Sequence, residues 1–193
     1  MAKKLPKSTE KRIKQAIFAK ADEFGYVASG RVESGQFMDT LVSDPDIGGV
    51  LKEYMEKERI RTYIKDGVLN AYTKEKKKEL LSKKGPKQII KDVYGTDADV
   101  IQSCSGKDEG VYVLRNSQGE IFVISSGTVL KWETALRKAL DIIARQSGLT
   151  INDNTPDICL RLAEVGQALT ESERTHITKA LGAVNVKAVF CNK

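Results

Sequence analysis

The stretch VYVLRNSQGEIFVI, residues 111–124, contains the clearest fold signal in the chain. Two short runs rich in β-branched and aromatic residues, 111–114 and 121–124, flank the turn-forming residues RNSQG. Both runs are apolar at consecutive positions, which is typical of strands covered on both faces. The stretch therefore predicts two strands of a sheet with helices packed on it.

The flanking sequence extends this sheet. DVIQSC, residues 99–104, predicts a strand before the hairpin, and the alternating run 184–190 predicts a half-exposed edge strand. We predict helices at 129–146, from one apolar stripe; at 156–169, opened by Thr155-Pro156; and at 171–181, opened by the capping box TESE. The fold class expected is a mixed α+β or α/β fold with a small, mainly antiparallel sheet.

Residues 1–91 have a different character, with helical spacing of apolar residues and an excess of basic ones. They carry 21 Lys and Arg against 13 Asp and Glu, whereas residues 92–193 carry 11 against 13. We therefore expect a helical basic region, 1–91, and an α/β domain, 92–193, which could also pack as a single body. Within the first region, residues 60–73 fit either a hairpin turning at Asp66-Gly67 or helices, and we favour helices.

The most basic segment is KEKKKELLSKKGPKQIIK, residues 74–91, with eight lysines and two glutamates. That excess of +6 equals the formal net charge of the whole protein. Rows of ammonium groups on helices match the spacing of nucleic-acid phosphates. Each phosphate that is neutralised releases counterions and contributes salt-dependent affinity. The helix predicted at 129–146 adds a second row at seven-residue intervals. The predicted nucleic-acid-binding residues are Lys74, Lys76, Lys77, Lys78, Lys83, Lys84, Lys87, Lys91, Lys131, Lys138 and Arg145.

Other residue types exclude several classes of site. Cys104, Cys159 and Cys191 lack the spacing of a zinc site or a disulfide framework, and His176 is the only histidine. No stretch has the length and apolarity of a membrane span, and the basic amino terminus has no apolar core of a signal peptide. We expect a cytoplasmic protein with no membrane partner, no metal and no cofactor.

A second function is suggested by the order of the elements. Asp108 and Glu109 precede the strand 111–114, and Glu120 opens the strand 121–124, before the helix at 129–146. This order resembles the core of PD-(D/E)xK nucleases, which implies Mg²⁺ bound by carboxylates. Where that family has a lysine two positions after the glutamate, this chain has Phe122, and the next lysine is Lys131. The resemblance covers residues 97–146 and implies Asp108, Glu109, Glu120 and Lys131 as catalytic residues.

Three hypotheses follow from the sequence. The first is a non-catalytic nucleic-acid-binding protein, with DNA favoured over RNA, serving as an accessory subunit in DNA processing or in defence against foreign DNA. The second is the Mg²⁺-dependent endonuclease with a degenerate core. The third is a protein interaction subunit, or a homo-oligomer, that pairs through the edge strand 184–190.

Overall fold

A computed structural model describes residues 4–145 and 155–192. The chain divides into two compact units. Unit 1 consists of Met1–Lys76 and Val165–Ala168, and unit 2 consists of Lys77–Glu164 and Leu169–Lys193. The predicted division into domains 1–91 and 92–193 stays a prediction, because a compact unit need not fold as an independent domain.

Unit 1 is helical. Its elements are α1 (Lys7–Phe24), η1 (Tyr26–Ala28), α2 (Arg31–Ser43), η2 (Pro45–Gly49), α3 (Lys57–Thr62), η3 (Tyr63–Leu69) and the first part of α4 (Asn70–Ser82). Ile13 and Ile17 of α1 are buried, as are Leu41 of α2 and Ile60 of α3. The helices of this unit therefore share one apolar core, formed by residues at helical spacing.

The ambiguous segment 60–73 is helical, as we favoured. It runs from α3 through the π-helical η3 into α4 with no strand, so the hairpin alternative is wrong. Ile64, Val68 and Leu69 are buried on this segment. Burial of these three side chains decides the structure, and the wider π-helical turn accommodates Gly67 without ending the helix.

Unit 2 contains a five-stranded sheet in the order β1-β2-β3-β4-β5. The strands are β1 (Ala98–Ser103), β2 (Val111–Asn116), β3 (Ile121–Thr128), β4 (Asp157–Ala163) and β5 (Val186–Cys191). The first three strands are antiparallel, whereas β3, β4 and β5 are parallel. The α+β fold class is confirmed, and the sheet is mixed instead of mainly antiparallel. The strand predicted at 184–190 is β5 and forms an edge.

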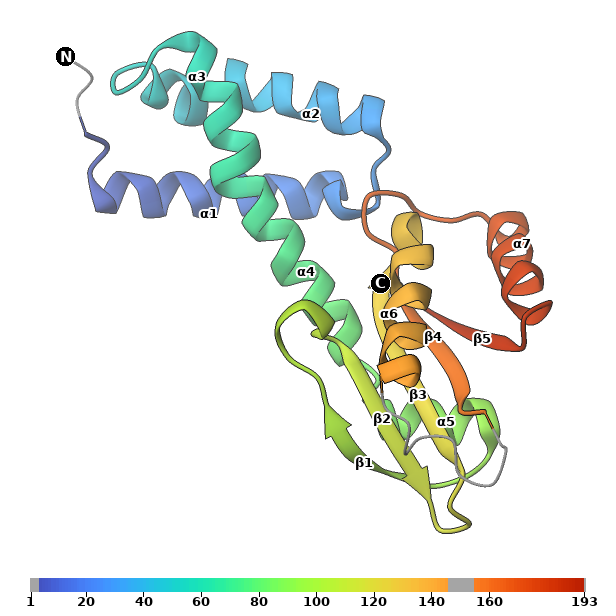
Figure 1. Cartoon of the computed structure of the whole chain (residues 1–193). Coiled ribbons are helices and arrows are strands. Elements are labelled where there is room, and N and C mark those ends of the chain that lie inside the picture. The colour runs from blue at the N-terminus through green and yellow to red at the C-terminus, as the bar shows by residue number, and fades with distance from the viewer. Residues whose placement is uncertain (1–3, 146–154, 193) are drawn as a thin grey trace. The chain divides into compact units, whose positions relative to one another are not determined.

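Helices cover both faces of this sheet (Figure 1). On one face, α6 (Trp132–Arg145) and α7 (Glu171–Gly182) pack on side chains such as Val123 and Leu160. On the other face, α5 (Pro86–Tyr94) packs on Phe122 and Cys159. Neighbouring residues of β3 and β4 thus point into different cores, which confirms the expectation of strands covered on both faces.

The helix predicted at 156–169 is wrong, because residues 157–163 form β4. Pro156 was interpreted as the first residue of a helix, but DICLRLA is apolar at nearly every position, like the two strands of the central hairpin. The helix at 171–181 is confirmed as α7, with the Thr170 hydroxyl accepting from the Glu173 amide at 3.3 Å. The helix at 129–146 is confirmed as α6 after a short 3₁₀ turn, η5 (Val129–Lys131), and residue 146 lies outside the described residues.

One arginine is buried at the centre of β4. Arg161 is 5% exposed, and its guanidinium donates to the carbonyl oxygens of Leu81 and Lys84 at 2.9 and 3.0 Å. It also donates twice to the Ser126 hydroxyl and lies over the ring of Tyr112. Arg161 therefore joins the chain that leaves α4 to the middle of the sheet.

Replacing Arg161 with Met should lower the free energy of unfolding of unit 2 by about 2–4 kcal/mol. The reason is that the carbonyl oxygens of Leu81 and Lys84 and the Ser126 hydroxyl lose their donor. Each acceptor that stays buried without a partner costs about 1–3 kcal/mol of stability. Urea unfolding followed by the fluorescence of Trp132, the only tryptophan, measures this change. The matched control is Arg137→Met on the exposed side of α6, expected within about 0.5 kcal/mol of the wild type. Equal stability of the two variants would contradict the anchoring role of Arg161.

Candidate functional site

Three lysines of the predicted binding stretch are paired with aspartates. Lys84 lies 2.7 Å from Asp92, Lys87 lies 2.5 Å from Asp99, and Lys91 lies 3.0 Å from Asp97. The Asp92 carboxylate raises the pKa of Lys84 by accepting its hydrogen bond. The positive charge around α5 is therefore largely balanced, although exposed ion pairs of this kind are weak and can be displaced.

Two further lysines have other partners. Lys76, the last residue of the first segment of unit 1, forms an ion pair with Asp22 at 3.0 Å and lies over the ring of Tyr72. Lys83 donates to the carbonyl oxygen of Asn192 at 3.3 Å. Lys74 and Lys78 are exposed on α4. The predicted stretch 74–91 is thus not one continuous surface of uncompensated charge.

Positive charge concentrates instead where the two predicted lysine rows meet. Lys77 of α4 is half-buried, and its pKa is lowered by burial first and then by the charges of Lys138 and Lys131. Glu109 opposes these effects but does not cancel them. We call Lys77, Lys131 and Lys138 the lysine cluster. Among the described residues, no carboxylate pairs with any of its three ammonium groups.

The position of α6 depends on a close approach to β3. Gly127, near the end of β3, is buried, and a Cβ atom there would lie 2.9 Å from the Cβ of Ala135. A side chain at this position would push α6 away from the sheet. Because Gly127 has no side chain, α6 lies close to β3, and η5 and α6 place Lys131 and Lys138 beside Lys77.

Two neighbours define the rim of the lysine cluster. Lys138 donates to the backbone carbonyl oxygen of Glu109 at 3.4 Å, which holds its side chain over the loop before β2. Arg145, the third member of the predicted α6 row, instead binds both oxygens of Asp108, at 2.9 and 3.1 Å. This arginine holds the pKa of Asp108 below its usual value. The α6 row is therefore cationic at Lys131 and Lys138 and balanced at Arg145.

The residues of the nuclease alternative lie at different ends of the hairpin. Asp108 and Glu109 precede β2, and Glu120 precedes β3, but Val111 pairs with Ser125 while Arg115 pairs with Ile121. In an antiparallel pair this register separates the two ends by about 13 Å, at about 3.3 Å per residue.

Two of the three carboxylates also have another partner. Asp108 binds Arg145, and Glu120 accepts from the Asn116 amide. Lys131 lies at the Asp108 end of the hairpin, in the lysine cluster. Within residues 4–145 and 155–192, no three His, Cys, Asp or Glu side chains gather as a metal site would require. The structure does not bring the four predicted catalytic residues together.

We expect the pKa of Lys77 to lie below 10.5, the ordinary lysine value. Burial and two nearby ammonium groups disfavour the charged form of Lys77. NMR titration of the Nζ and Cε signals of Lys77 measures this pKa. The variant Lys138→Gln should move the pKa of Lys77 back toward 10.5, the ordinary value, because one repulsive charge is gone. An unchanged pKa of Lys77 in Lys138→Gln would mean that the cluster does not form.

No helix in the described ranges, 4–145 and 155–192, has the length and apolar composition needed to cross a membrane. Comparison of the chain with family models, with curated proteins and with solved structures gave no match. Any function assigned to the chain therefore depends on the residues themselves.

Proposed function

We propose that this chain is a non-catalytic DNA-binding protein of the cytoplasm that contacts the phosphate backbone through the lysine cluster. The observation that supports this function is the convergence of Lys77, Lys131 and Lys138, from three different elements, with the pKa of Lys77 lowered by burial and by the other two. The proposal includes the accessory role in DNA processing or in defence against foreign DNA.

The physical basis is that three like charges without paired carboxylates repel one another. Such an arrangement is unfavourable in the free protein and becomes favourable when an anion lies between the charges. A phosphate group supplies the missing negative charge, and its contact with lysine releases condensed counterions. The cluster thus has the electrostatics of a surface that is completed by its ligand.

The chemistry of lysine also indicates the type of recognition. An ammonium group is a point charge that does not form the bidentate contacts by which arginine reads guanine. Contacts with phosphates position a protein on nucleic acid but carry no sequence information. We therefore expect salt-dependent binding with little preference for base sequence, to which the exposed Lys78 contributes at longer range.

Replacing Lys77, Lys131 and Lys138 together with Gln should weaken binding to duplex DNA and lower the slope of log affinity against log salt by about 2–3. Fluorescence anisotropy of labelled duplex DNA, titrated at several salt concentrations, measures both quantities. The matched control replaces Lys84, Lys87 and Lys91 with Gln. It removes the same formal charge, but from lysines already paired with aspartates, so the slope should change by less than about 1.

The outcomes of this experiment separate the hypotheses. Equal losses in the two triple variants would show that net charge, and not the lysine cluster, carries the binding. Tighter binding of single-stranded DNA or RNA than of the duplex would correct the choice of ligand. Samples incubated with Mg²⁺ and run on a denaturing gel should show intact strands. Cleavage that disappears in Glu120→Ala would overturn the non-catalytic proposal in favour of the nuclease.

DNA affinity should fall as the pH rises toward 10.5, the ordinary lysine pKa. Phosphates favour the charged form of Lys77, so DNA binding raises its lowered pKa. Above the pKa of free Lys77, the side chain must take up a proton in order to bind, and the affinity therefore falls as the pH rises. The variant Lys77→Arg stays charged throughout and should show a flatter pH profile. Anisotropy at constant ionic strength from about pH 7.5 to 9.5 tests this, since ordinary lysines are still charged there. Parallel profiles for the two proteins would exclude Lys77 from the interface.

A further inference from the structure

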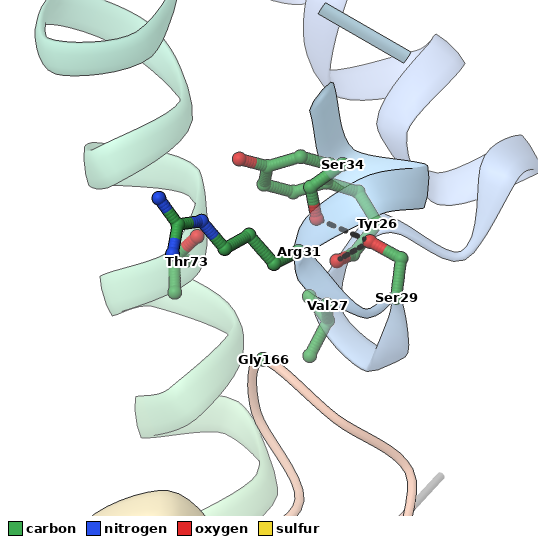
Figure 2. Close-up of a pocket in the computed structure, with 7 residues that line it drawn as sticks. All are labelled: Tyr26, Val27, Ser29, Arg31, Ser34, Thr73 and Gly166. Carbon is green, nitrogen blue, oxygen red and sulfur yellow. Dashed lines mark hydrogen bonds between the residues drawn. The ribbon is translucent and has the colours of Figure 1, made fainter. Parts of the chain in front are cut away.

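A separate pocket lies entirely within unit 1 and plays no part in the proposed DNA contact. Its volume is about 230 Å³, and Figure 2 shows its lining. The lining residues are Tyr26 and Val27 of η1, Ser29 just after η1, Arg31 and Ser34 of α2, Thr73 of α4, and Gly166. Backbone hydrogen bonds from Gly166 and Ala168 to the carbonyls of Val27 and Ala28 fix one wall.

Arg31 is the only charged residue among those that line the pocket. Its side chain extends toward Thr73 on the facing helix (Figure 2). Within the described ranges, no hydrogen bond or ion pair holds its guanidinium. Arg61 of the same unit, in contrast, is paired with Asp39. The pocket therefore presents an arginine whose five N–H donors are unused by the protein.

The hydroxyl groups of the pocket fall into two sets. Ser29 donates to the carbonyl oxygen of Tyr26 at 2.9 Å, so Ser34, 2.7 Å from the Ser29 hydroxyl, must donate to Ser29. These two hydrogens are used within the protein. The hydroxyls of Tyr26 and Thr73 have no partner among the described residues. Burial raises the pKa of Tyr26, which keeps its hydroxyl protonated as a donor.

The free donors therefore come from three side chains on three elements, around one space that no carboxylate lines. A planar carboxylate has two oxygens, and the guanidinium fork alone can bind both. A tetrahedral phosphate monoester has three terminal oxygens and a double negative charge near neutral pH, so it can use the guanidinium and both hydroxyls together. We propose that this pocket binds a small phosphate monoester through Arg31, Thr73 and Tyr26.

The size of the space limits the rest of the ligand. Ligand pockets for drug-sized molecules enclose about 300–1,000 Å³, so this one accepts the phosphate and a small organic group. Tyr26 and Val27 give that group an aromatic and an aliphatic wall. A sugar phosphate or the phosphorylated end of a longer molecule would fit this description. The inference concerns binding alone and needs no bond to form or break.

Phenyl phosphate is a suitable probe, with benzoate as the planar control anion. Titration of the ¹⁵N-labelled full chain by NMR should shift the amide signals of Val27, Thr73 and Gly166 with saturation. The variant Arg31→Gln should weaken phenyl phosphate binding by about tenfold or more, because the only charged donor is lost. Thr73→Val and Tyr26→Phe should each weaken it by about three- to tenfold, as expected for one lost hydrogen bond. Benzoate should bind more weakly than phenyl phosphate and be little affected by the two hydroxyl variants.

Arg59→Gln is the matched control, because Arg59 is exposed on α3 of the same unit and does not line the pocket. It should leave phenyl phosphate binding unchanged. Equal weakening by Arg31→Gln and Arg59→Gln would overturn the inference, as would shifts that never saturate or that spread over the lysine cluster. The triple Lys-to-Gln variant of the lysine cluster should bind phenyl phosphate normally. The failure of one proposal is therefore distinguishable from the failure of the other.

Discussion

The burial of Arg161 is the constraint on which unit 2 depends. A guanidinium is costly to remove from water, and here its hydrogen-bond acceptors are two backbone carbonyls and a serine hydroxyl instead of a carboxylate. The hydrogen bonds from the Arg161 guanidinium to Leu81 and Lys84 hold residues 81–84 against β4. Lys77 precedes Leu81 by about one helical turn, so the same anchor determines where Lys77 stands relative to α6. A buried charge in the sheet thus positions a partly exposed set of charges.

The net charge of unit 2 does not reveal which of its cations are paired with carboxylates. Around α5, each of three lysines has an aspartate neighbour, and at the end of α6, Arg145 has Asp108. Where η5 and α6 approach Lys77 of α4, ammonium groups meet without such partners among the described residues. Which cations remain uncompensated after folding therefore depends on contacts between residues about 50–60 positions apart.

The sequence predicts the elements better than their pairing. Consecutive apolar residues identified the central hairpin, and the capping box at Thr170 identified the start of α7. The same apolar pattern was present in DICLRLA, but Thr155-Pro156 before it favoured a helix. The meeting of Lys77 with Lys138 had no local signal at all, because it follows from the register of α6 on β3, made possible by Gly127. The pairing of Lys87 with Asp99 was equally invisible, since tertiary contacts and not helical spacing set it.

Unit 1 is built from two segments that are far apart in the sequence, which affects how the chain folds. Val165–Ala168 belongs to unit 1, although the chain on both sides of it belongs to unit 2. During synthesis, the first 76 residues must therefore wait for a segment almost 90 residues later before Gly166 can bind the carbonyl of Val27. A shortened gene product that ends before this segment would leave the helical unit incomplete. The helical unit thus depends in biogenesis on a segment that follows most of unit 2 in the sequence, and the wall of the pocket is among the last parts of the helical unit to form.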